Sequence, residues 1–239
     1  MEGAPGFRPL YRQVYDHLVK QIASGAWKPS EALPSEQALA AKLGVSQGTV
    51  RKALDAMAGE NIIERRQGKG TYVAEYNEER ALFRFFRMAR PGGERALPEC
   101  GQEDVDLRKA NREEADKLGL DRGTSVYEIR RTRLIDGKRA IYEHIVVPAA
   151  RFPRLKEKAP LPNALYTIYQ SPYGVNIVQT EEELRADLAR KEDNARLGIP
   201  IGSPILHIER VAREIEGTPV EFRITRCDTT HLVYAVTIR

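Results

Sequence analysis

The chain has 239 residues, of which 41% are hydrophobic, so we expect one or two domains with a buried core. Its formal net charge of +4 is too small for a protein that coats nucleic acid by charge alone. No secretory signal or membrane-spanning apolar run is visible, and Cys100 and Cys227 lie outside any metal-binding motif. We therefore expect a cytoplasmic protein without a metal, a cofactor or a membrane partner.

A first amphipathic helix is predicted over residues 10–24, after a loose arm formed by residues 1–8. Gly25 ends this helix, and Trp27 is expected in the core of the same domain. The apolar residues of the helix recur on one face, at Leu10, Val14, Leu18 and Ile22.

Two further helices separated by a glycine turn are predicted from residue 35 onward. Ser35 and Ser46 can each accept an N–H group of a first helical turn, and Gly44 can adopt the left-handed conformation that ends a helix. This order is typical of a helix-turn-helix. In the second helix a buried stripe is formed by Val50, Ala53, Leu54 and Met57, and the opposite face carries Gln47, Gly48, Arg51, Lys52 and Asp55. That polar face suits the major groove of DNA.

A strand–turn–strand pattern follows over residues 62–73. Its glycine-rich turn, residues 65–70, contains three cations, Arg65, Arg66 and Lys69, which are placed to meet phosphate groups. A capped helix pair alone is usually only structural, and a basic hairpin tip alone is usually a solvated turn. Both together, in this order and spacing, indicate a winged helix-turn-helix that binds DNA.

The remaining residues contain an internal repeat with a period of roughly 80 residues. Each copy has a short charged helix, a strand, a turn and a second strand, and Asp136-Gly137 between alternating strands is a strong hairpin signal. The first copy's strands are predicted at 126–135 and 139–147, and the second copy's at 205–215 and 220–226. We also predict a helix at 165–169, extended chain at 175–182 and a last strand at 232–238, while 82–110 fits neither type clearly. Two hairpins with interposed helices predict an antiparallel sheet of the α+β class.

Arg131 and Arg133 share one face of the strand at 126–135 with apolar residues, and Glu143 lies among aliphatic residues of the partner strand. Charges on an apolar face must be paired or must border a cavity. Two interpretations remain open from the pattern. The three side chains form a structural ion network or a wet surface, or the guanidinium groups hold an anionic small molecule.

These motifs resemble the GntR family of bacterial transcription regulators, and the second part resembles the UTRA domain of its HutC-type branch. The resemblance implies three regions: a winged helix-turn-helix DNA-binding domain at 1–75, a linker at 76–81 and an effector-binding and dimerisation domain at 82–239. UTRA domains resemble chorismate lyase in fold. The matching residues are Pro9-Leu10-Tyr11, Gly25, Leu33-Pro34-Ser35-Glu36, Leu39-Ala40, Gly44-Val45-Ser46, Thr49-Val50-Arg51-Lys52-Ala53-Leu54 and Gly68-Lys69-Gly70-Thr71.

The predicted DNA contacts come from the helix pair and the wing, at Ser35, Gln37, Ser46, Gln47, Gly48, Thr49, Arg51, Lys52, Arg65, Gln67, Gly68 and Lys69. The resemblance implies an effector site at Arg131, Arg133, Glu143, Tyr166 and Glu221. Four positions depart from the family. Gln37 and Gln47 replace arginines that help to read the operator, Ala164 replaces a serine of some sugar-phosphate-binding relatives, and Cys227 replaces their tyrosine.

We therefore expect a homodimeric repressor that binds double-stranded DNA at a pseudo-palindromic operator. A small anionic metabolite in the second domain is expected to lower its DNA affinity. Two other classes remain: an enzyme of chorismate lyase-like fold that acts on an anionic small molecule, and a constitutive architectural DNA binder. No nucleophile–base pair, metal cluster or phosphate loop in the sequence commits the chain to catalysis.

Overall fold

A computed structural model describes residues 9–60, 62–75, 82, 85–215 and 217–237. The chain separates into two compact units between residues 76 and 77, and each unit is described by itself. The linker predicted at 76–81 lies outside the described residues, so the domain boundaries drawn from the sequence stay a prediction.

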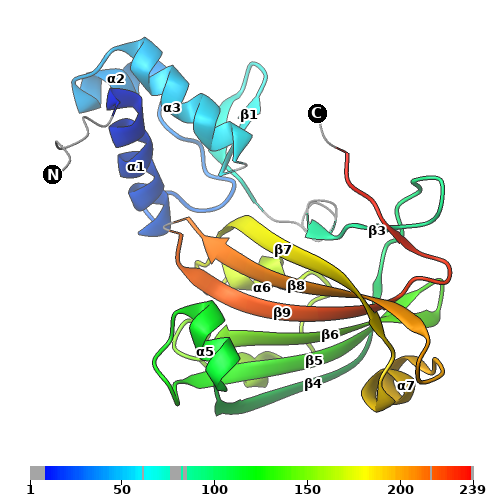
Figure 1. Ribbon diagram of the computed structural model, residues 1–239. Helices are drawn as coiled ribbons and strands as arrows, with labels where there is room; N and C mark the ends of the chain where they lie inside the picture. Colours follow the sequence, from blue (N-terminus) through cyan, green and yellow to red (C-terminus); the bar gives the residue numbers. More distant parts are fainter. Residues whose placement is uncertain (1–8, 61, 76–81, 83–84, 216, 238–239) are drawn as a thin grey trace, which may run out of the picture. The chain divides into compact units, whose positions relative to one another are not determined.

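The first unit contains three helices and a hairpin (Figure 1). Helix α1 (Leu10–Ala23) packs against α3 (Gln47–Gly59), and α2 (Glu36–Leu43) precedes α3. The apolar stripes predicted from their spacing form the core of this unit. Its fully buried side chains include Leu18, Leu39, Val50, Ala53, Leu54 and Met57.

Local capping holds the helix-turn-helix as predicted. The Ser35 hydroxyl accepts the N–H of Ala38 at 3.1 Å, and the Ser46 hydroxyl accepts the N–H of Thr49 at 3.1 Å. Between them, Gly44 adopts φ 65°, a left-handed conformation that costs glycine little. The chain therefore turns sharply from α2 into α3 with its end groups satisfied.

The hairpin consists of β1 (Ile63–Arg66) and β2 (Gly70–Val73), which pair antiparallel. Gly68 takes φ 70° at its tip, and the Lys69 N–H donates to the Arg66 carbonyl at 2.9 Å. The strand bases are buried, whereas the tip is exposed. This is the geometry of the predicted wing.

The second unit is built on one six-stranded antiparallel sheet in the order β4-β5-β6-β9-β8-β7. Its strands are β4 (Glu99–Lys109), β5 (Ser125–Ile135), β6 (Lys138–Pro148), β7 (Ile177–Leu188), β8 (Pro204–Glu214) and β9 (Pro219–Asp228). A separate two-stranded pair joins β3 (Met88–Ala89) to β10 (Val233–Tyr234). The α+β class predicted from the sequence is confirmed.

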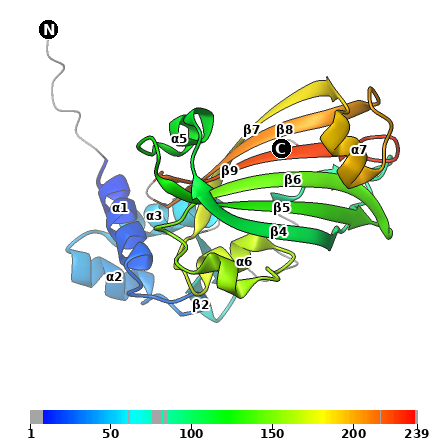
Figure 2. The same cartoon turned by 90° about the horizontal axis from the view of Figure 1, so that it is seen from below.

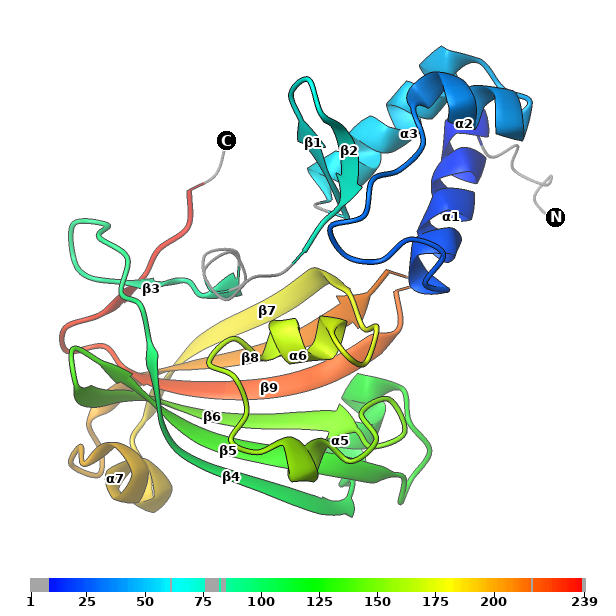
Figure 3. The same cartoon turned by 180° about the vertical axis from the view of Figure 1, so that it is seen from behind.

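Short helices cover both faces of this sheet, as opposite views show (Figures 1 and 3). Helices α5 (Arg112–Leu118) and α7 (Lys191–Leu197) lie on one face, at its two ends (Figure 2). Helix α6 (Leu165–Gln170) lies on the other face, preceded in the chain by the 3-10 helix η1 (Leu155–Lys158).

The two sequence repeats come together with two-fold register at the centre of the sheet. Strands β6 and β9 pair antiparallel with Ile141 opposite Cys227, His144 opposite Ile224 and Val146 opposite Phe222. Exchanging the two copies reproduces this pairing about the His144–Ile224 pair. The repeat therefore generates a nearly symmetric sheet, with α5 packed on β9 and α7 packed on β6.

Three elements differ from the sequence prediction. The 11-residue strand β4 is missed, since it lies at a sheet edge and its residues are mostly polar on both faces. Strand β7, at the other edge, extends to Leu188 because it pairs with β8 along its length. The last strand is short, because β10 pairs only with the two residues of β3.

Candidate functional site

The polar face of α3 is exposed in the first unit. Arg51 is 57% exposed and Arg65, on β1, is 40% exposed, yet both contact the carboxylate of Glu36 at the start of α2. The Nε and Nη2 atoms of Arg51 each lie 2.9 Å from Glu36 Oε2, and Arg65 Nη2 lies 3.3 Å from Oε1. The Gln47 amide also donates to Oε2, at 3.4 Å. The structure thus gathers three predicted DNA contacts around one carboxylate.

Glu36 was quoted in the sequence only as part of a matching motif and not as a site residue. Its side chain is 18% exposed, and its pKa lies below the ordinary glutamate value, chiefly because Arg51 hydrogen-bonds to the ionised form. Residue 36 lies 11 to 29 positions from its partners, so no local pattern could have revealed the cluster.

The other predicted DNA contacts lie on exposed or half-buried positions of the same unit. Lys52 places its ammonium 4.4 Å from the ring centroid of Tyr11, and Arg66 lies 4.2 Å from that of Tyr72, so aromatic rings orient both cations. Ser46 and Thr49 share a 2.8 Å hydroxyl hydrogen bond. The exposed residues include Ser35, Gln37, Gln47, Gly48, Gln67, Gly68 and Lys69.

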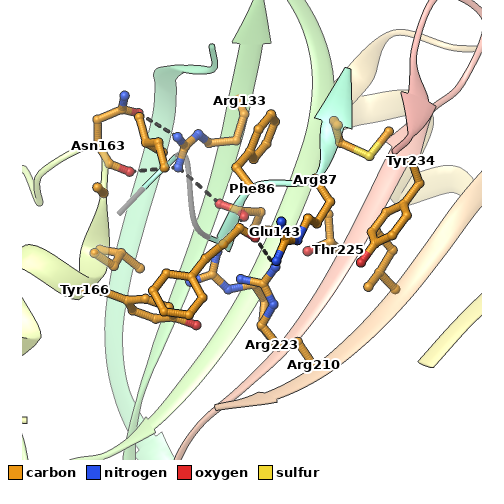
Figure 4. Close-up of a pocket in the computed structure, with 16 residues that line it drawn as sticks. Phe86, Arg87, Arg133, Glu143, Asn163, Tyr166, Arg210, Arg223, Thr225 and Tyr234 are labelled. Carbon is orange, nitrogen blue, oxygen red and sulfur yellow. Dashed lines mark hydrogen bonds and ion pairs between the residues drawn. The ribbon is translucent and has the colours of Figure 1, made fainter. Parts of the chain in front are cut away.

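The second unit contains a cavity of about 60 Å³ on the face of the sheet that carries α6 (Figure 4). Four arginines and one glutamate line it, together with aromatic and amide side chains. Strands β5, β6, β8 and β9 supply the charged residues Arg133, Glu143, Arg210 and Arg223, while Arg87 comes from the chain before β3. The other polar and aromatic lining residues are Phe85, Phe86, Asn163, Tyr166, Thr225 and Tyr234.

Arg133 is held at the cavity wall by Asn163. Its Nη1 donates to the Asn163 carbonyl at 3.0 Å, and its Nη2 donates to the Asn163 side-chain oxygen at 2.7 Å. The buried Nε of Arg133 lacks a hydrogen-bond partner within the described part of the chain. Burial lowers the pKa of Arg133 to about 10, against the opposing effect of Glu143, so the guanidinium remains charged at neutral pH.

Glu143 is the acidic centre of the cavity. Arg223 Nη1 donates to it at 2.7 Å, and Arg133 Nη1 lies 3.4 Å away. Burial alone would raise the pKa of this carboxyl, but Arg223, followed by Arg133 and Arg131, lowers the pKa to about 2. Glu143 is therefore ionised throughout the physiological pH range.

Two of the predicted effector residues lie behind the cavity wall. Arg131 is fully buried and donates to the Asn163 carbonyl at 2.7 Å, and its Nε lies 3.6 Å from Glu143. Glu221 accepts hydrogen bonds from Tyr166 at 3.0 Å and Tyr169 at 2.8 Å. The cavity lining includes Arg133, Glu143 and Tyr166 but neither Arg131 nor Glu221. The ion network and the cavity, which the sequence posed as alternatives, are both present.

Sequence reasoning missed Arg210 and Arg223, although the repeat contains a signal for them. Arg131 pairs with Glu143 across β5 and β6, and Arg210 pairs with Arg223 at the equivalent register of β8 and β9. The two arginines of the second copy thus occupy the positions of Arg131 and Glu143. Applying the 80-residue period to the first arginine would have found them.

Comparison with known proteins agrees with both units. The family model described as bacterial regulatory proteins, gntR family, matches residues 10–73, and the UTRA domain model matches residues 97–232. The mannosyl-D-glycerate transport/metabolism system repressor MngR of Escherichia coli (strain K12) is 31% identical over 220 residues, covering 91% of this chain and 90% of MngR. The chain belongs to the GntR family.

Other relatives of this GntR protein are also regulators. The HTH-type transcriptional repressor NagR of Bacillus subtilis (strain 168) is 29% identical over 214 residues, covering 89% of this chain and 88% of NagR. This GntR-family chain is therefore a DNA-binding transcriptional regulator and not an enzyme. Within the described residues, no helix is both long and apolar enough to cross a membrane.

Solved structures show the same fold. The ligand-binding domain of a chain assigned to the GntR family, from Bordetella bronchiseptica, matches 70% of this GntR chain and all of that domain, with a TM-score of 0.60 and 25% identity. PhnF from Mycobacterium smegmatis matches 95% of this chain and 99% of its own, with a TM-score of 0.55 and 22% identity.

Proposed function

We propose that this regulator is a repressor whose operator affinity falls when a small anionic metabolite binds in the second unit. The observation that supports this most is the cavity lined by Arg87, Arg133, Arg210 and Arg223 against a single lining carboxylate, Glu143. Guanidinium groups hold carboxylates and phosphates through paired N–H donors. The relatives NagR and MngR are named as repressors, which favours repression here as well.

The proposed ligand has a polar, ring-sized part besides its anionic group. Tyr166, Tyr234 and Phe86 offer ring faces or edges, while Asn163 and Thr225 offer hydrogen bonds for hydroxyl groups. The unpartnered Nε of Arg133 supplies a further donor beside the cavity. These features suit a carboxylated or phosphorylated sugar better than a purely apolar compound.

The cavity of about 60 Å³ is small beside the ~300 Å³ or more of ordinary ligand sites, so one wall must move to admit a sugar. Residues 85–88 line the cavity and precede the sheet in the chain. Arg210 donates to the Phe85 carbonyl at 2.5 Å, and the Phe85 ring meets Tyr166 edge-on with centroids 4.7 Å apart. We propose that the ligand displaces this wall and thereby changes the path of the linker.

The DNA-bound form is proposed to be a cytoplasmic homodimer that places two recognition helices in successive major grooves, ~34 Å apart. Two-fold pairing lengthens the site that one helix can read. Sedimentation of the protein at micromolar concentration with its DNA site tests this, and a monomer under those conditions would contradict it.

The effector proposal is tested by calorimetric titration with mannosyl-D-glycerate and with hexose phosphates, followed by DNA binding in the presence of the ligand that binds. The operator is obtained by selecting sites from random duplex DNA with the wild-type protein. We expect saturable binding and a coupling of ~1–3 kcal/mol between ligand and operator. Arg133→Met should abolish that binding, whereas Arg130→Met, on the opposite face of the same strand, should retain it. Equal ligand binding by the two variants would place the site elsewhere.

A further inference from the structure

The DNA-reading arginine Arg51 and the wing arginine Arg65 share one carboxylate in the protein without DNA. Glu36 Oε2 takes both contacts from Arg51, at 2.9 Å, and Oε1 takes the contact from Arg65, at 3.3 Å. Glu36 therefore connects three elements, because it begins α2 while its partners lie on α3 and on β1. Helix caps and hydrophobic contacts already hold these elements, so the carboxylate has a further effect on the reading face itself.

Asp55 extends the cluster along α3. It lies one turn beyond Arg51 and pairs with Arg65 at 2.7 Å. The cluster thus contains two cations and two carboxylates, and its local charge is balanced. Arg51 or Arg65 can reach a phosphate only by leaving an acidic partner. For exposed pairs that exchange costs ~0.2–1 kcal/mol, which is roughly a one- to five-fold effect on affinity.

The two contacts to Glu36 also fix how Arg51 is presented. They occupy its Nε and one Nη2 donor, so the remaining guanidinium donors point away from the carboxylate. A bidentate contact to guanine needs such a preset fork. A loosely held arginine would instead bind whichever phosphate is nearest, without regard to sequence.

We infer that Glu36 is a positioning residue that raises the sequence specificity of this regulator. It restrains Arg51 in one orientation and withholds Arg51 and Arg65 from the phosphates of unrelated DNA. A carboxylate at the reading face also repels the backbone of DNA whose bases do not match. This inference rests on the proposed DNA-reading surface and adds a residue that discriminates between sequences.

The test measures the affinity of the full chain for its selected operator and for a scrambled duplex of equal length, as a function of salt. The variant Glu36→Gln keeps the size of the side chain and leaves the Ser35 cap in place. We expect its affinity for scrambled DNA to rise about two- to five-fold. The salt slope on scrambled DNA should steepen by about one unit, because one arginine becomes available for phosphate. The ratio of operator to scrambled affinity should fall at least about threefold.

Asp55→Asn is the matched control, since it removes the same charge from the same cluster without touching Arg51. It should change both affinities together and leave their ratio at the wild-type value. An unchanged ratio for Glu36→Gln, or an equal fall of the ratio in both variants, would overturn the inference. Thermal unfolding of each variant verifies that the first unit remains folded.

Arg51→Ala distinguishes the failure of this inference from the failure of the reading surface. Unchanged operator binding by Arg51→Ala would show that the DNA-reading surface is elsewhere and would refute both proposals. Weakened operator binding by Arg51→Ala, together with a wild-type ratio for Glu36→Gln, would refute only the role of Glu36.

Discussion

Arg131 and Arg133 both donate to the backbone carbonyl of Asn163, at 2.7 and 3.0 Å, yet only Arg133 lines the cavity. Two residues apart on β5, they share one face of the sheet and one anchoring oxygen. Arg131 is fully buried under the loop that contains Pro162 and Asn163, while Arg133 extends beyond it. One strand pattern therefore supplies a structural cation and a candidate ligand-binding cation.

This difference predicts opposite phenotypes for two matched substitutions. Arg131→Met should destabilise the second unit by about 3–5 kcal/mol, because it removes a fully buried partner of Glu143 and Glu103. Arg133→Met should cost less, since Glu143 keeps Arg223, but it should abolish the metabolite response. Hydrogen exchange of β5 and β6 peptides measures the first effect, and operator release by the metabolite measures the second. Equal loss of stability in both variants would contradict the assignment.

Arg51→Ala should weaken operator binding by ~1–3 kcal/mol if Arg51 contacts a base through two donors. The loss should be much smaller on scrambled DNA, because phosphate contacts alone carry no sequence information. Fluorescence anisotropy with both duplexes measures the difference. An equal loss on both would indicate that Arg51 binds phosphate.

Lys69 at the hairpin tip should contribute charge rather than sequence reading. Lys69→Ala is expected to weaken binding to all sequences alike and to reduce the salt slope by about one unit. Lys20→Ala, an exposed lysine in the last turn of α1, serves as the control and should retain the wild-type slope. A slope that is unchanged by Lys69→Ala would remove the wing from the DNA interface.

Gln47 is expected to favour adenine at its position, because its amide matches the N6 and N7 edge of that base. Gln47→Arg should shift the preferred base toward guanine, the partner of a bidentate arginine. Sites selected from random DNA with each protein show the result. The same consensus for both proteins would mean that residue 47 does not read a base.

Glu143 predicts how the second unit responds to acid. Its pKa of about 2 in the folded chain lies below the ordinary value of 4.5, so ionised Glu143 stabilises the fold at and above pH 4.5. As the pH falls from 4.5 toward 2, the unfolded chain takes up this proton first and about 3 kcal/mol of stability is lost. Glu143→Gln should be less stable at pH 6 and should lose less stability over that interval. Hydrogen exchange of β6 peptides at several pH values measures this, and parallel profiles for the two proteins would rule it out.

The sequence by itself determined the helix-turn-helix, because its signals are local. The Ser35 and Ser46 caps, the Gly44 turn and the apolar stripe of α3 depend only on near neighbours in the chain, and the structure forms each of them. The repeat likewise indicated four central strands of the sheet through alternation and turn residues. Alternation also placed Arg131 and Arg133 on one face.

Tertiary structure decided what each charged residue contacts. Glu36 meets Arg51 and Arg65 only after α2, α3 and the hairpin pack together. Arg223 reaches Glu143 because the two-fold register sets β9 beside β6, 80 residues later in the chain. Whether a buried charge is a structural partner or borders a cavity depends on these long-range contacts, and the periodicity of a single strand does not contain that information.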